Sequence, residues 1–217
     1  KLTNTDKFAR ESLQNSCDAS QSNFTSIKIR SMSFNDALRR NYEEELAINS
    51  FLKPRIESDR NDFPRIEDLN EILFVEDYYT WGLTETQEEI IHRDESRFYK
   101  FFFDIGGNDL SNDLGGAYGF GKAVYADNSR IRTIVAYSCS KEKNGTFVTK
   151  LLGITKSPSY RYGDKNIRYS GFTYHGGEEI LDKEDEKDGE TIPLYNDEAD
   201  QIALKLGFNT RERSDEG

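Results

Sequence analysis

The stretch that decides the fold lies near the start of the chain and reads Glu11-Ser12-Leu13-Gln14-Asn15-Ser16-Cys17-Asp18-Ala19. At about 100° per residue, a helix through this stretch places Glu11, Asn15 and Asp18 on one face. The opposite face carries Ala9, Leu13 and Cys17. We therefore expect a helix that buries this second face in the core, while its polar face presents a carboxylate and an amide. The alternative is an ordinary amphipathic helix with a solvated polar face.

The composition predicts a folded domain rather than a disordered chain. Only 35% of the 217 residues are hydrophobic, but the chain contains 14 Phe, 12 Tyr and one Trp. Each aromatic ring buries a large apolar area, which compensates for the modest number of aliphatic residues. The length allows one large domain or two small ones, and we expect a single domain over residues 1–217 with long polar loops.

Charge and cysteine content limit the function classes. The net charge of −11 excludes a global basic field for nucleic acid, although a local basic groove stays open. Cys17 and Cys139 are too few for a disulfide framework and lack the spacing of a metal site. There is no apolar run of about 18 residues and no signal-peptide core near the start. We expect no membrane span and a cytoplasmic location.

The hydrophobic periodicity predicts alternating helices and strands. We expect helices over 6–20, 35–51 and 197–206, a helix start at 123–127, and strands over 24–32, 72–75, 131–138 and 146–155. Thr5 is the expected N-cap of the first helix, and the polar stretch 53–64 the expected loop. The turn at Asn144-Gly145 predicts that the last two strands pair as a hairpin.

A second informative stretch is glycine-rich and reads Gly115-Gly116-Ala117-Tyr118-Gly119-Phe120-Gly121-Lys122. Glycines let backbone N–H groups approach a phosphate, and a helix that begins just after them adds its positive dipole end. The P-loop pattern fits except at Ala123, which lacks the hydroxyl that binds Mg²⁺. Because no buried strand precedes the stretch, we reject the P-loop interpretation. A flexible hinge is the structural alternative.

The third stretch follows the apolar strand directly and reads Asp77-Tyr78-Tyr79-Thr80-Trp81-Gly82-Leu83. We expect the Asp77 carboxylate to be buried at the strand end beside an aromatic-lined pocket, where it can accept a hydrogen bond from an exocyclic amine. We expect Gly82 to let a flat ring lie against the backbone. An Asp that merely caps the strand end is the alternative.

In this order the three stretches resemble the GHKL ATPases, the family of DNA gyrase B subunits, MutL proteins, histidine kinases and the ninety-kilodalton heat-shock chaperones. The stretch from Glu11 to Ala19 matches the N-box E-x-x-x-N-x-x-D-A at every defined position. The stretch from Asp77 to Gly82 resembles the D-x-G-x-G box, with Tyr79 at the first glycine position. Gly116, Gly119 and Gly121 resemble the G-x-x-G-x-G box. The resemblance spans about residues 6–155.

The resemblance implies a Bergerat fold, an α/β (α+β) two-layer sandwich in which helices cover one face of a mixed, largely antiparallel sheet. It implies an Mg²⁺-dependent ATPase in which Asn15 binds Mg²⁺ and Glu11 activates the attacking water. Asp77 would bind the adenine amine, with Gly82 beside it. The residues assigned to the phosphates are Gly116, Tyr118, Gly119, Phe120, Gly121 and Lys122. Residues 84–114 would form a lid over ATP.

The resemblance also implies that the domain is a nucleotide-driven switch in a larger protein, with further domains and homodimerisation on ATP binding. A second hypothesis is a binding module that keeps a nucleotide pocket without turnover. Its basis is the tract 160–169, whose tyrosines and arginines could stack bases of a nucleic acid. The same tract also suits a packed β-hairpin with exposed charges. His92 and His175 lack partners at metal spacing, and we expect structural or surface roles for both.

Overall fold

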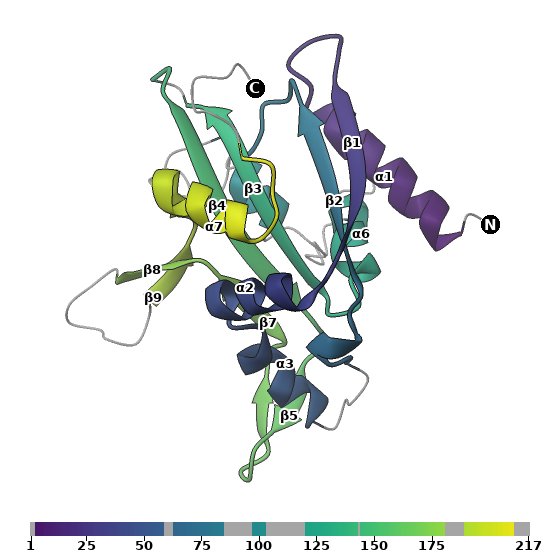
Figure 1. The fold of residues 1–217 in the computed structure, drawn as a ribbon, viewed down its shortest axis with the longest axis vertical. Coiled ribbons are helices and arrows are strands. Elements are labelled where there is room, and N and C mark those ends of the chain that lie inside the picture. Colours follow the sequence, from purple (N-terminus) through teal and green to yellow (C-terminus); the bar gives the residue numbers. More distant parts are fainter. Residues whose placement is uncertain are drawn as a thin grey trace, which may run out of the picture.

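The computed structural model describes residues 3–58, 63–84, 97–102, 120–142, 144–180 and 189–210. In these ranges the chain has an α+β fold, in which antiparallel strand pairs lie between two groups of helices (Figure 1). Every strand pairing among these residues is antiparallel. The expected α+β class with a largely antiparallel sheet is confirmed at this level.

The first helix, α1 (Asn4–Asp18), begins two residues before the predicted start. Thr3 rather than Thr5 is the N-cap: its hydroxyl accepts a hydrogen bond from the Asp6 amide at 3.1 Å, and the Asp6 carboxylate accepts one from the Thr3 amide at 2.9 Å. This reciprocal pair is a capping box, which satisfies two amides that the helix leaves free.

The predicted core face of α1 is wrong. Leu13 is 46% exposed and Cys17 is also exposed, whereas Ser12 and Ser16 are fully buried. The reason is the packing of α1 against a second helix, α6 (Phe120–Asn128). Small serine side chains let two helices approach closely, so polarity alone does not indicate which face is buried.

The strands β1 (Ser26–Ser33) and β2 (Glu71–Tyr78) form an antiparallel pair, with Ser26 opposite Tyr78 and Ser33 opposite Glu71. Their long connection carries α2 (Asp36–Leu46), α3 (Ile48–Ile56) and the short 3-10 helix η1 (Ile66–Asp68). We predicted one helix over 35–51, but Ala47 adopts a left-handed conformation with φ of 47° and divides it. The predicted loop from residue 53 was wrong for its first residues, because α3 continues to Ile56.

A second sheet is built on the predicted hairpin of β3 (Thr133–Lys141) and β4 (Phe147–Lys156). Two further strands, β7 (Phe172–His175) and β10 (Leu194–Tyr195), pair with β4. Two smaller hairpins stand apart from it: β5 (Tyr160–Tyr162) with β6 (Ile167–Tyr169), and β8 (Gly177–Ile180) with β9 (Gly189–Ile192). The predicted pairing of the two long strands is confirmed.

Helices cover both faces of the β3–β4 sheet, so the prediction of helices on one face is wrong. On one face Leu151, Val135 and Tyr137 belong to the main core, together with α2, α3 and α7 (Asn196–Lys205). On the other face Leu152 and Ile154 pack against Phe102 of α5 (Arg97–Phe102), which is 1% exposed. Successive strand residues point to opposite faces, and both faces of β4 carry apolar side chains. In Figure 1, α2 and α7 lie in front of these strands.

The C-terminal helix α7 confirms the helix predicted over 197–206, and Gly207 follows it with φ of 89°. In the ranges that the structure describes, no helix is both long and apolar enough to cross a membrane. Of the expected lid, only residue 84 and α5 lie within the described ranges. There, α5 is anchored by Phe102 in the smaller core.

Candidate functional site

The end of α1 is tied to the end of β2, so two of the three predicted motifs meet. The Trp81 amide donates to the Ala19 carbonyl at 2.9 Å, and the Gln21 amide donates to the Tyr79 carbonyl at 3.0 Å. The Gln21 side chain adds a bond to the Thr80 carbonyl at 2.7 Å. These contacts join residues about 60 positions apart in sequence and fix the helix against the strand end.

Asp77 lies near the end of β2 and is exposed, so the expectation that it is buried was wrong: it is close to the point where the strand ends at the surface. Its carboxylate accepts a hydrogen bond from the Thr80 hydroxyl at 3.3 Å. Two residues that follow it adopt left-handed conformations: Tyr79 with φ of 64° and Gly82 with φ of 59°. This region favours glycine, because a Cβ atom crowds the following carbonyl. The backbone at Tyr79 therefore has a conformation that glycine adopts more easily than tyrosine.

The role predicted for Gly82 differs from the structure. A Cβ atom on Gly82 would lie 2.8 Å from Ser138 Oγ and 3.3 Å from Ser140 Cβ. The space above this glycine is filled by β3, so no flat ring can lie there. Glycine is required at this position because the segment after β2 packs tightly onto β3 with a positive φ.

The next residue, Leu83, is held by a buried ion pair that sequence reasoning missed. Its amide donates to Ser138 Oγ at 2.9 Å, and its carbonyl accepts from Lys150 Nζ at 3.0 Å. Lys150 Nζ also lies 2.6 Å from Glu142 Oε1, and the two side chains are only 1% and 5% exposed. The available signal was a lysine in the middle of a largely apolar strand, where a charge is buried only with a partner.

Tyr125 of α6 lies among the predicted site residues and is the main addition that the structure makes. Burial raises the pKa of Tyr125; hydrogen bonding with Asn15 opposes this shift, and the charge of Asp77 adds to it. Its ring packs edge-on to Phe8 of α1 at 6.0 Å. The Tyr125 hydroxyl is therefore next to the Asn15 amide and within range of the charge of Asp77. The sequence signal was an aromatic residue one turn after Gly121.

The structure brings Asn15 and Asp77 to the same region, and it describes Glu11 one turn before Asn15 on α1. Glu11 and Asn15 are half-buried. The Glu11 side chain keeps 26% of its surface exposed and pairs with exposed Arg10 at 3.3 Å. This surface contact is weak and easily exchanged, so it leaves the carboxylate accessible to water.

The glycine-rich stretch is described only in part. Gly116, Tyr118 and Gly119 lie outside the described residues, while Phe120, Gly121 and Lys122 form the first turn of α6. The helix thus begins within the stretch, three residues before the predicted start. Its start supports the expectation of a helix N-terminus beside the glycines, where backbone N–H groups are unpaired.

The donor atoms of the described part fit the expected ligands. Asn15 offers an amide oxygen, and Glu11 and Asp77 offer carboxylates; oxygen donors suit Mg²⁺, and a carboxylate suits an exocyclic amine. Within the described ranges, no group of three or more His, Cys, Asp or Glu residues could hold a metal by itself. A magnesium ion at Asn15 would therefore need ligands from the nucleotide phosphates, as is usual for this metal.

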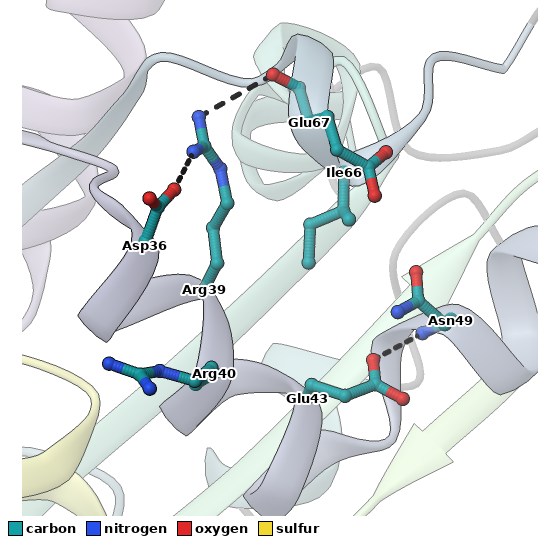
Figure 2. A pocket seen from close by; sticks show the side chains of 7 residues that line it. All are labelled: Asp36, Arg39, Arg40, Glu43, Asn49, Ile66 and Glu67. Carbon is teal, nitrogen blue, oxygen red and sulfur yellow. Dashed lines mark hydrogen bonds and ion pairs between the residues drawn. The ribbon is translucent and has the colours of Figure 1, made fainter.

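A separate hollow lies on α2 and η1, away from these residues (Figure 2). It has a volume of about 490 Å³ and is lined by Asp36, Arg39, Arg40, Glu43, Asn49, Ile66 and Glu67. Arg39 pairs with Asp36 at 2.8 Å, and the Glu43 carboxylate accepts from the Asn49 amide at 2.7 Å. These polar side chains bond to neighbouring residues of the same helix or of the next one. The hollow contains no predicted site residue.

Comparison of the chain with protein-family models, curated proteins and solved structures finds no match. The resemblance to the GHKL ATPases therefore rests on the three motifs and on the geometry described above.

Proposed function

We propose that this chain is a cytoplasmic ATP-binding and ATP-hydrolysing domain of the GHKL type. The observation that carries the proposal is that the three separate stretches are neighbours. The helix that carries Asn15 packs against α6, which begins in the glycine-rich stretch, and the end of the same helix is hydrogen-bonded to the chain that follows Asp77. Unrelated surface helices and strand ends have no reason to bring these residue types together.

Each site residue has a role in this proposal. Asp77 would accept a hydrogen bond from the adenine amine, and Asn15 would bind Mg²⁺. Backbone amides from Gly116 to Lys122 would bind the phosphates, with Lys122 adding a positive charge. When bound, Mg²⁺ would neutralise phosphate charge in the transition state.

Glu11 would orient the attacking water and take its proton on a carboxylate oxygen. Its partial burial and its position one turn before Asn15 suit a base next to the phosphates. Gly82 has a structural role here, since it allows the segment after Asp77 to pack on β3. ATP would act as a switch if it binds one arrangement of residues 84–114 better than another, and so changes dimerisation or a neighbouring domain.

The decisive experiment replaces Glu11 with alanine and with glutamine. ATP affinity, steady-state phosphate release and the thermal midpoint are measured for each variant and for the parent. A general base contributes mainly in the transition state, so both variants should bind ATP as the parent does while turnover falls by roughly 10²-fold or more. Glu44→Ala is the matched control, because Glu44 is an exposed glutamate on α2.

The outcomes separate the competing hypotheses. A parent that binds ATP with Mg²⁺ but does not hydrolyse it supports the non-hydrolysing binding module instead. A parent that does not bind ATP removes both nucleotide hypotheses. If Glu11→Ala hydrolyses ATP at the parental rate, Glu11 is not the base. Loss of thermal stability in Glu11→Ala but not in Glu44→Ala would indicate a structural role for the side chain.

A further inference from the structure

The strand β1 has an open edge. Among the residues that the structure describes, β1 pairs with β2 on one side and with no strand on the other (Figure 1). The preceding helix α1 has its main packing against α6 and not against this strand. The pairing with β2 runs without a bulge from Ser26 to Ser33, and β1 contains no proline. Proteins usually protect a sheet edge of this length and regularity, because its free N–H and C=O groups can bind another extended chain.

The free main-chain groups of this edge can be assigned to individual residues. The Phe34 amide, directly after β1, donates to the Asn70 carbonyl at 2.8 Å, so these two residues form a hydrogen-bonded pair in the same register. In an antiparallel ladder, such pairs alternate with pairs whose N–H and C=O groups point away from each other. The groups that point to the open edge therefore belong to every second residue of β1: Ile27, Ile29, Ser31 and Ser33.

The two faces beside this edge differ in chemistry, because alternate strand residues point to opposite faces. On one face, Ile29 of β1 and Leu73 of β2 stay 47% and 52% exposed, which leaves an apolar strip next to the edge. On the other face, the Glu76 carboxylate lies 2.6 Å from Arg30 and 3.9 Å from Lys28. One carboxylate there faces two cations, so this group of three keeps a net positive charge. The Lys28 side chain is 58% exposed.

A second copy of the chain fits this edge poorly. If two β1 strands pair antiparallel about a two-fold axis, the registers that overlap most of the strand place Arg30 opposite either Arg30 or Lys28 of the other copy. Like charges directly opposite each other destabilise a strand pair. Each copy would also bring its net positive group to the contact. Charged edge residues are one way in which proteins prevent such self-pairing.

We propose that the open edge of β1 binds an extended segment of a partner protein, which adds an antiparallel strand and alternates apolar with acidic residues. The main chain of this segment bonds to Ile27, Ile29 and Ser31, and its apolar side chains extend the strip of Ile29 and Leu73. Main-chain bonds of this kind give affinity, while alternate side chains give specificity. The proposal does not rest on ATP binding or hydrolysis.

The acidic side chains of the segment lie opposite Lys28, on the face that keeps a net positive charge. Lys28 is at a position where the added strand makes no mutual hydrogen bonds, and cross-strand side chains are closest at such positions. At physiological salt, exposed charges more than about 8 Å apart are largely screened. The local group around Lys28 therefore determines the preference for acidic residues, although the whole chain has a net charge of −11.

Amide hydrogen exchange, followed by NMR, tests the edge directly. In the free protein, the amides of Ile27, Ile29 and Ser31 should exchange rapidly, whereas those of Lys28 and Arg30 should exchange slowly because they are bonded to β2. The probe is a labelled peptide in which valines alternate with glutamates and a serine stands at each end. An excess of this peptide should slow exchange of the first set by at least about tenfold.

Peptide variants separate main-chain pairing from simple hydrophobic contact. The valine amides of the bound peptide point to β1, and the glutamate amides point away from it. N-methylation of the valine amides should therefore abolish binding in fluorescence anisotropy, whereas N-methylation of the glutamate amides should be tolerated.

Protein variants test the two faces and the edge itself. Ser31→Pro removes an outward N–H without breaking a bond to β2, and should weaken binding at least about tenfold. Lys28→Glu should weaken binding about fivefold, and should strengthen binding of a peptide with lysines in place of the glutamates. Lys165→Glu is the matched control, since Lys165 is exposed and lies in the turn between β5 and β6. Thermal midpoints verify that the variants fold.

Four results would overturn the proposal. Slow exchange of the outward amides in the free protein would show that another part of the chain covers the edge. Protection that grows with protein concentration in the absence of peptide would make a second copy the occupant. Equal binding of the glutamate and lysine peptides would remove the charge preference. Absence of binding by the parent would remove the site.

Discussion

Replacing Lys150 with methionine tests how the segment after β2 is held in place. Methionine keeps most of the length and volume of the side chain but removes the ammonium group. The Glu142 carboxylate would then lose a partner at 2.6 Å, and the Leu83 carbonyl would lose a donor at 3.0 Å. The Ser140 hydroxyl, at 3.4 Å from the same carbonyl, replaces that donor only in part.

The expected cost follows from burial. With the side chains of Lys150 and Glu142 only 1% and 5% exposed, solvent screens the pair very little. Removing one partner of a buried ion pair costs about 3–5 kcal/mol, because the other charge stays buried. For a chain of 217 residues, 1 kcal/mol shifts the thermal midpoint by about 2–4 °C. Lys150→Met should therefore lower the midpoint by roughly 6–20 °C.

The assay is chemical and thermal denaturation of three variants beside the parent. Lys150→Met/Glu142→Leu removes both charges and should recover most of the loss, since an apolar pair often replaces a buried ion pair at little cost. Lys28→Met is the control: its side chain is 58% exposed, and it should change stability by less than about 1 kcal/mol. Equal effects of Lys150→Met and Lys28→Met would refute the reasoning, as would a double variant no more stable than Lys150→Met.

Three further predictions concern single residues. Burial lowers the pKa of His175 from 6.5 to about 4, so the folded chain takes up this proton later than the unfolded chain. Stability should fall by up to about 3 kcal/mol between pH 6.5 and pH 4, and His175→Gln should flatten that slope in denaturation curves. Tyr79→Gly should be more stable than Tyr79→Ala by about 1 kcal/mol, since both remove the ring but only alanine keeps the strained Cβ; equal stabilities would contradict this. Asp77→Asn should weaken ATP binding by about 1.5–3 kcal/mol and reduce the preference for adenine over guanine in calorimetry, and unchanged values would mean that another residue reads the base.

The elements that the sequence predicted well are those that local signals specify. The β3–β4 hairpin follows from alternating residues and from the turn at Asn144-Gly145, where Gly145 has φ of 87°. The helix α7 follows from apolar spacing and the glycine after its end. Such features depend on residues within a few positions of one another, so a single sequence is sufficient.

The break between α2 and α3 could not be predicted in this way. Ala47 is neither glycine nor proline, yet it takes a left-handed conformation. Its two neighbours, Leu46 and Ile48, are 5% and 1% exposed. Burial of both requires the chain to turn between them, and Glu43 then caps the first turn of α3 through the Asn49 amide. Tertiary packing has here overridden local helix propensity.

The residues of the candidate site also divide into those that local sequence predicts and those that only tertiary contacts reveal. The N-box pattern led to Glu11 and Asn15 from sequence alone, and the apolar strand led to Asp77. Tyr125 and Lys150 were missed because their roles depend on contacts with residues far away in the chain. The prediction of the buried face of α1 was also wrong. Packing against α6 buries the face that carries Ser12 and Ser16 instead of the more hydrophobic face.

The contacts around Asp77 determine what a ligand would have to do. Asp77 itself is paired in β2 opposite Ile27. The chain that follows is bonded to the end of α1 through Tyr79 and Trp81, and then to β3 and β4 through Leu83. The backbone of Asp77 is therefore fixed before a ligand binds and does not need to be ordered by it. Since ordering of flexible groups reduces affinity, this arrangement leaves more of the interaction energy for binding. It follows that Lys150→Met, which removes the donor to the Leu83 carbonyl, should weaken ATP binding although Lys150 is not one of the predicted site residues, and that Lys28→Met should not.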